Sequence, residues 1–358
     1  MKKRLVALIG VVLMIATVVS GCVKMDPEQT LATVGGVDIK LDLANFYARY
    51  QQSQIEEMFG SYMGGADMWK QDIEGQNYEE LTQESILDTL ILMHILEARQ
   101  DEFGVSLSEK ETDEIAEVAQ AFLEANGEEE KAVISATRET VERMLTLTAI
   151  EAKMRTAMTA DVDTNVSDKE AAQKKIEYVA FLFTSTDEEG VTKVVEEDGK
   201  EALREEAQKF AEEAKEAKNF AGLARERSYT AQEATFDSES THIDVTLLAE
   251  VDELKEGDIT GVVETGDGYY VAKLISLLDR EATDERKETI IVERKNEAYQ
   301  ELSEQWREEA SIERDDTAWK AISFIRQGVV RPVEEEPEAV DVGEGTNTEM
   351  EAAESESE

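Results

Sequence analysis

The chain has 358 residues with 82 acidic and 37 basic side chains, which gives a formal net charge of −45 at pH 7. This charge disfavours binding to nucleic acid, which requires a basic surface against the phosphates, and adsorption to anionic lipid for the same reason. Only three prolines and one cysteine are present. Such a composition predicts a mainly helical protein without a disulfide, and the length suggests two folding units.

The N-terminus predicts export and attachment to a lipid. Lys2, Lys3 and Arg4 precede an apolar run at residues 5–19, which is short for a bilayer span and typical of a cleaved signal peptide. The following Val19-Ser20-Gly21-Cys22 resembles the lipobox of bacterial lipoproteins. That resemblance implies cleavage before Cys22 and acylation of this residue, which would hold the chain on the extracytoplasmic face of a bacterial cell membrane. The alternative is a simple secreted protein.

Residues 31–160 predict two short strands followed by helices. Residues 31–34 and 37–39 flank a Gly35-Gly36 turn. Ser108 and Glu111 form a Ser-x-x-Glu capping box that marks a helix start. Apolar spacing predicts helices from about residue 42, at 81–102, from 108 to 125 and at 130–160. Residues 58–72 are rich in Gly and Met and predict a loop or an interrupted helix.

The pattern changes near residue 162. A buried strand is predicted at 175–184 and two helices follow, at 201–217 and from 220. Residues 228–250 show no clear periodicity. Two strands at 259–263 and 269–275 surround a glycine turn, and a long helix is predicted at 282–312.

These elements predict an α+β protein. The simplest packing returns the last helix to the first ones, so that a mainly helical lobe formed by both chain ends holds an inserted small α/β domain. The final segment is acidic and is expected to be disordered. The expected division is a signal peptide (1–21), a tether (22–30), a helical region (31–160), the insert (161–280), a returning helix (281–325) and an acidic tail (326–358).

Several segments resemble PrsA-type foldase lipoproteins, with a SurA-like N-terminal chaperone region and a parvulin-type prolyl isomerase domain. Two segments carry the resemblance to the N-terminal chaperone region. One is residues 32–39 followed by a helix, and the other is residues 86–91 that continue into 102–109. Within the insert, residues 219–224, 254–259 and 268–274 are similar to parvulins. The resemblance covers about residues 31–324 and implies a chaperone for exported polypeptides.

The resemblance also implies two active-site histidines, and this sequence departs from it at both. Ala180 stands at the first position and Tyr270 at the second. The remaining catalytic candidates are Tyr270, Phe181 and His242. Whether the chain is an enzyme is therefore left open, and the insert is expected to act as a scaffold or a peptide-binding module.

The sequence predicts neither a metal site nor a cofactor. Its two histidines are His94, on the apolar face of a predicted helix, and His242 in a predicted loop. A single histidine does not make a metal site, and His94 is expected to be a hydrogen-bonded core or groove residue. No phosphate-binding glycine loop is found.

Adaptable and aromatic side chains gather between residues 58 and 69, and such side chains suit a surface that binds many apolar peptides. The candidates for client binding are Met58, Phe59, Met63 and Trp69. Most of them are expected to fill the core, and one or two to contact clients.

Three functions remain open. The preferred one is a membrane-anchored, ATP-independent extracytoplasmic chaperone or foldase that binds unfolded or partly folded exported polypeptides. The second is an active prolyl cis-trans isomerase of the parvulin type, and the third is a non-enzymatic binding lipoprotein of the cell surface. Composition does not determine the oligomeric state.

Overall fold

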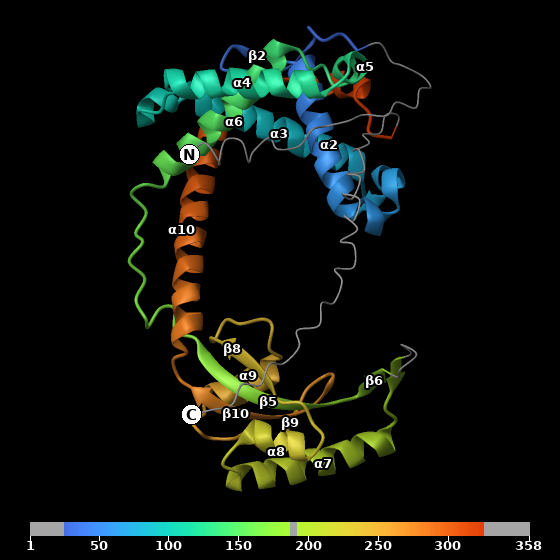
Figure 1. Cartoon of the computed structure of the whole chain (residues 1–358), viewed down its shortest axis with the longest axis vertical. Coiled ribbons are helices and arrows are strands. Elements are labelled where there is room, and N and C mark those ends of the chain that lie inside the picture. Colours follow the sequence, from blue (N-terminus) through green and yellow to red (C-terminus); the bar gives the residue numbers. More distant parts are fainter. Residues whose placement is uncertain (1–24, 187–191, 326–358) are drawn as a thin grey trace, which may run out of the picture. The chain divides into compact units, whose positions relative to one another are not determined.

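The computed structural model describes residues 25–186 and 192–325. The predicted signal peptide with Cys22 and the acidic tail at 326–358 lie outside the described residues. The chain divides into two compact units, of which the second comprises residues 158–302 and the first comprises the chain on either side of it. In Figure 1 the first and last described segments lie together in the first unit. The expected fold class is confirmed, because a mainly helical lobe contains both chain ends and the α/β unit is inserted.

A three-stranded antiparallel sheet joins the two chain ends. It consists of β1 (Thr30–Val34), β2 (Val37–Lys40) and β11 (Ile312–Arg314) in the order β11-β1-β2. Gly35 and Gly36 form the turn between β1 and β2 with φ of 57° and 85°, a left-handed conformation that glycine adopts without steric cost. Ala32 lies opposite Arg314, so the last described strand is bound to the first one.

The helices of the first unit begin and end where local chemistry dictates. Ser108 and Glu111 form the predicted capping box at the start of α4. Gly64 ends α2 in the left-handed region at φ 86°, as helices often end at glycine. The helical elements are α2 (Leu41–Met63), η1 (Gly65–Lys70), α3 (Tyr78–Ala98), η2 (Gln100–Phe103), α4 (Glu109–Ala125), α5 (Glu128–Val133) and α6 (Arg138–Met158), with a small hairpin of β3 (Asp72–Ile73) and β4 (Gln76–Asn77) before α3.

The expected single helix at 130–160 is wrong, because the structure contains two helices, α5 and α6. Ser135 between them has a φ of 57°, which a helix cannot contain. Asn45 on α2 donates hydrogen bonds to the Val133 carbonyl and to the Ser135 hydroxyl. Thr137 accepts a hydrogen bond from the Thr140 amide and begins the next helix. Tertiary bonds to α2 therefore stabilise a break that apolar spacing alone did not reveal.

The chain end packs deep into the first unit. After η3 (Ala318–Ala321), Phe324 is fully buried and its ring lies 4.7 Å from that of Trp69. Arg49 on α2 is buried, donates to the Ser323 carbonyl and lies over the Phe324 ring. Trp69 also stacks on Tyr78 at the start of α3. Aromatic packing and a buried guanidinium thus hold residues 322–324 against α2 and α3.

The second unit is built on a four-stranded antiparallel sheet in the order β8-β5-β10-β9. The stretch at 228–250, where the sequence indicated nothing, contains β8 and α9. Helices α7 and α8 contribute to one buried cluster and α9 to another. The elements are β5 (Lys174–Leu182), β6 (Thr184–Thr186), β7 (Thr192–Val194), α7 (Glu197–Glu216), α8 (Phe220–Glu226), β8 (Gln232–Phe236), α9 (Val245–Asp252), β9 (Val263–Glu264), β10 (Gly268–Ser276) and α10 (Arg280–Glu309), whose last turns belong to the first unit.

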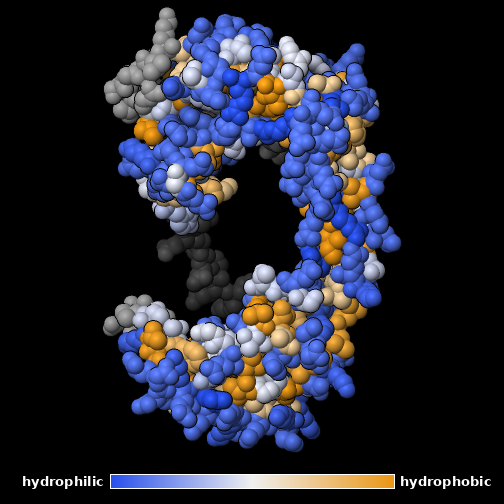
Figure 2. All heavy atoms as spheres, turned by 180° about the vertical axis from the view of Figure 1, so that it is seen from behind, coloured by the Kyte–Doolittle hydropathy of each residue, from blue (hydrophilic) through white to orange (hydrophobic). Residues whose placement is uncertain are grey.

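The surface is mostly hydrophilic, as the charge predicts. In Figure 2 hydrophobic residues form small separate patches among hydrophilic ones. Among the helices of the described residues, none is long and apolar enough to cross a membrane.

Replacement of Phe324 by alanine tests whether the chain end stabilises the first unit. We expect Phe324→Ala to lower its free energy of unfolding by about 3–5 kcal/mol, because a buried aromatic ring is removed. All three tryptophans, Trp69, Trp306 and Trp319, belong to this unit, so urea denaturation followed by tryptophan fluorescence reports on it. The neighbouring Ile325 is exposed, and Ile325→Ala is expected to change stability by less than about 0.5 kcal/mol. Equal effects of the two substitutions would contradict this view.

Candidate client-binding surfaces

The sheet of the second unit has one face covered by α7 and α8 and another on which α9 packs. The first face carries Val179, Phe181 and Val271, which pack against α7 and α8. The opposite face carries Ile176, Ala272 and Leu274, which pack with α9. Because side chains alternate along a strand, each position of β5 and β10 is assigned to one face.

The two positions at which the resemblance implies histidine lie directly opposite each other. Ala180 on β5 and Tyr270 on β10 are paired residues of the antiparallel ladder. Tyr178 precedes Ala180 by two residues on the same face, and its ring centroid lies 5.9 Å from that of Tyr270. The structure therefore brings Ala180 and Tyr270 together on the face against which α9 packs, where Tyr178 and Tyr270 form a half-buried tyrosine pair.

The Tyr270 hydroxyl is already engaged. It donates a hydrogen bond of 2.9 Å to Oδ2 of Asp267. Burial raises the pKa of Tyr270 well above its usual value, and the hydrogen bond to Asp267 and the negative charges of Asp267 and Asp244 raise it further. The phenol therefore stays protonated with its proton directed at Asp267. It can accept a hydrogen bond, but it has no second proton to donate to a peptide carbonyl.

The structure separates the other two catalytic candidates from this pair. Phe181 lies on the opposite face, where its ring contacts those of Phe210 and Tyr229. His242 is exposed in the loop before α9, and its Nε2 lies 2.8 Å from the Thr235 carbonyl. Of the three candidates, only Tyr270 lies beside Ala180 on the face with α9.

An apolar group that the sequence did not reveal accompanies Tyr270. Tyr178, Leu248 and Tyr270 are half-buried and pack against the cluster beneath α9, and Val245 at the start of α9 is 76% exposed. This helix lay in the stretch without clear periodicity, so its two faces could not be assigned. The face thus offers apolar and aromatic contact area without a charged catalytic group.

The first unit exposes apolar side chains on the last turns of α2. Tyr62 is 88% exposed, Met58 64% and Phe59 43%, while Met63 is half-buried. Trp69 is fully buried and donates through Nε1 to Glu56. The structure thus places Met58 and Phe59 on the surface together with Tyr62, and Trp69 in the core. We call Met58, Phe59 and Tyr62 the α2 patch.

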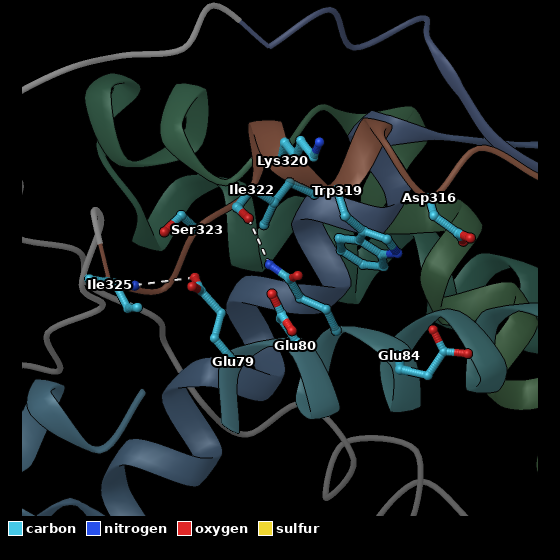
Figure 3. Close-up of a pocket in the computed structure, with 10 residues that line it drawn as sticks. Glu79, Glu80, Glu84, Asp316, Trp319, Lys320, Ile322, Ser323 and Ile325 are labelled. Carbon is cyan, nitrogen blue, oxygen red and sulfur yellow. Dashed lines mark hydrogen bonds between the residues drawn. The ribbon is translucent and has the colours of Figure 1, made fainter. Parts of the chain in front are cut away.

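A groove of about 550 Å³ lies between α3 and the chain end. Figure 3 shows Glu79, Glu80 and Glu84 on α3 and, across the groove, the segment with Trp319, Ile322 and Ile325. Gln83 donates to the Ile322 carbonyl and the Ile325 amide donates to Glu79, so hydrogen bonds connect the two walls (Figure 3). The sequence showed the apolar residues of this segment but not that they line a groove.

Three of the carboxylates that line this groove have partners within the protein. Arg314 donates two hydrogen bonds to Glu84, of 2.8 and 2.6 Å, and also pairs with Asp316. The guanidinium of Arg314 lowers the pKa of the Glu84 carboxyl. Glu79 accepts from backbone amides at the chain end. These carboxylates hold the wall of the groove in place, which is a structural role.

The described residues hold no group of three or more His, Cys, Asp or Glu placed to bind a metal ion. His94 is buried on α3 and lines a second, smaller cavity. His94 belongs to the first unit and His242 to the second.

Residues 184–287 match the model of the PPIC-type PPIase domain. We call the unit that contains this stretch the PPIC-type domain, after the family model that it matches. The match includes Tyr270 and His242 but begins after Ala180. No curated protein matches the chain.

Several solved structures are similar to the chain at low identity. A PrsA foldase from Lactococcus lactis is 13% identical, with 84% of this chain and 100% of that chain covered and a TM-score of 0.32. A prolyl isomerase PrsA from Bacillus cereus is 16% identical, with 82% and 97% covered and a TM-score of 0.31. A structure reported for PEB4 and Cj1289, SurA-like chaperones of Campylobacter jejuni, is 13% identical, with 80% and 99% covered and a TM-score of 0.29.

The electrostatic environment of Tyr270 in the PPIC-type domain is testable by titration. Removing the negative charge of Asp267 favours the phenolate, so we expect Asp267→Asn to lower the pKa of Tyr270 toward its ordinary value. The measurement is an NMR pH titration of tyrosine labelled with ¹³C in the ring. Asp198→Asn on α7 is the control and is expected to leave this pKa unchanged. A Tyr270 pKa that does not fall in Asp267→Asn would contradict the described hydrogen bond.

Proposed function

We propose that the chain is an extracytoplasmic chaperone of the foldase class, which binds unfolded or partly folded exported polypeptides and protects them from aggregation. The observation that carries the proposal is the α2 patch, because three large apolar side chains stand in solvent on an otherwise strongly charged protein. Methionine and aromatic side chains adapt to many partners, which suits promiscuous binding. The PPIC-type domain supports the same assignment to protein folding.

The net charge complements this role. A surface with a formal charge of −45 repels copies of itself and keeps a protein with exposed apolar groups soluble. It also attracts cationic unfolded chains, although charge alone names no partner. We propose that binding is weak and rapid and that it proceeds without ATP.

We further propose that Cys22 carries the lipid anchor. The support is the sequence Val19-Ser20-Gly21-Cys22 behind a basic start and an apolar run. More than one acyl chain makes such an anchor stable. The anchor would place the chaperone at the membrane surface, where exported chains emerge.

The PPIC-type domain is proposed to bind peptides without catalysing prolyl isomerisation. The barrier to rotation of the amide is about 18–20 kcal/mol, and a catalyst must stabilise the twisted bond through polar groups aimed at it. Ala180 supplies no polar group, and the proton of Tyr270 is held by Asp267. The half-buried tyrosine pair and the exposed Val245 still provide contact area for an apolar segment.

The α2 patch is tested by replacing Met58, Phe59 and Tyr62 with serine together. We expect this triple variant to suppress aggregation of a reduced, denatured model protein at least about threefold less than the unmodified chain, because apolar area is lost. Light scattering at several molar ratios measures the effect. The matched control also introduces three serines, at Ile275, Leu277 and Leu278, which are exposed apolar residues of the second unit. This control is expected to retain most of the suppression.

Two results would contradict the assignment of client binding to α2. The first is that both triple variants lose suppression equally, which would make the effect nonspecific. The second is that the unmodified chain fails to suppress aggregation at molar excess, which would remove the chaperone function itself.

A protease-coupled assay on a proline peptide separates the chaperone from an active isomerase. We expect the chain to leave the rate at its uncatalysed value, with a time constant of tens to hundreds of seconds. An acceleration that disappears in Tyr270→Phe would instead show that this tyrosine replaces the missing histidine. Circular dichroism of the variant provides the folding control.

A further inference from the structure

A second cavity of the first unit has the chemistry of a side-chain binding site. It has a volume of about 330 Å³ and lies at the turn between β1 and β2, the C-terminal end of α3 and the last turn of α10. Its apolar lining comes from elements distant in sequence: Val34, Ile95, Ala98, Trp306 and Ala310. His94 adds a titratable group to this lining. Val37 at the rim is half exposed, so the cavity is open to solvent.

His94 presents an unused hydrogen-bond acceptor. The residue is 4% exposed, and its Nδ1 lies 2.7 Å from the Leu90 carbonyl. A carbonyl only accepts, so Nδ1 carries the proton and Nε2 carries a lone pair. Nε2 has no hydrogen-bond partner among the described residues. Burial lowers the pKa of His94, so the ring is neutral at pH 7.

The charged groups around His94 are paired with one another. Arg143 donates two hydrogen bonds to Glu97. Arg99 pairs with Glu309 and lies 5.0 Å above the Trp306 ring. Arg99 also pairs with Glu102, so each arginine of this wall is engaged by a carboxylate. Nε2 of His94 is then an acceptor in the lining without a partner among the described residues, and a ligand that carries a donor would supply one.

We propose that this cavity binds a tyrosine side chain of a client polypeptide, with the phenol hydroxyl donating to Nε2 of His94. This inference rests on the proposed chaperone function and specifies the chemistry that one of its sites selects. Tyrosine combines an apolar ring, which packs on Trp306 and Ile95, with a single donor at its end. Phenylalanine leaves Nε2 unpaired. Lysine and arginine carry several donors for which the cavity offers one acceptor, and serine leaves most of the cavity unfilled.

The chain contains only two histidines, so an NMR spectrum of ¹⁵N-labelled histidine in the full chain, without a histidine tag, contains His94 and an internal control in His242. The probes are acetylated and amidated peptides of sequence Gly-Ala-Tyr-Ala-Gly and Gly-Ala-Phe-Ala-Gly. We expect the tyrosine peptide to shift the Nε2 resonance of His94 but not that of His242. Its Kd is expected to be at least about tenfold below that of the phenylalanine peptide.

Two variants test the assignment. His94→Phe removes the acceptor and is expected to abolish the preference for tyrosine, as measured by peptide titration with tryptophan fluorescence. Ala98→Leu at the mouth of the cavity is expected to weaken binding of both peptides. The unmodified chain already decides the question, because equal affinity for the two peptides, no binding, or a shift at His242 alone would overturn the proposal.

The pH dependence of the preference for tyrosine provides a separate test of the hydrogen bond to His94. Protonation of Nε2 turns the acceptor into a donor, so the preference for tyrosine is expected to disappear as the pH falls below the lowered pKa of His94. The charged groups around the cavity and His94 are already paired: Glu97 with Arg143, and Glu102 and Glu309 with Arg99. A preference that persists with a protonated His94 ring would contradict the hydrogen bond.

Failure of this site can be told apart from failure of the chaperone function. If the unmodified chain suppresses aggregation but shows no preference for tyrosine, only the cavity proposal fails. If it suppresses no aggregation, the chaperone function fails whatever the peptides show.

Discussion

The rest of the structure depends on the attachment of the last described segment, residues 312–325, to the first strand and to the helices that follow it. Strand β11 pairs with β1, and a few residues later Phe324 packs between Trp69 and Arg49. Without these contacts the helices α2 and α3 would lack one wall of their core. The same contacts make residues 158–302 an insert, because the chain must leave the first unit and return to it.

The two cavities of the first unit are consequences of this closure. One lies between α3 and the segment that Phe324 anchors, and the other lies where the last turn of α10 meets the β1–β2 turn. Each has one wall from the beginning of the chain and another from its end. A protein that binds unfolded chains needs apolar surface that stays exposed, and the strongly negative charge keeps such a surface soluble.

In the PPIC-type domain we propose that the fold is kept without the chemistry that the resemblance implies. The sheet and helices that place two side chains opposite each other on β5 and β10 are present, and Ala180 and Tyr270 occupy those places. Ala180 supplies no polar group, and the Tyr270 hydroxyl donates its proton to Asp267. Fold and function are separable in this way because function depends on a few side chains that the fold only positions.

The sequence by itself determined the elements whose signals are local. The capping box of Ser108 and Glu111, the Gly35-Gly36 turn and the strand at β5 are set by neighbouring residues. The order of helices and strands along the chain also predicted an inserted α/β unit, which the long-range contacts of β11 close off. Only the tertiary structure decided which side chains meet. It placed Trp69 in the core but left Phe59 in solvent, put Phe181 on the opposite face from Tyr270, and broke the helix before Thr137 through bonds from Asn45. Whether a side chain is buried, and which elements it packs against, depend on contacts between residues far apart in the chain. Local periodicity carries no information about such contacts.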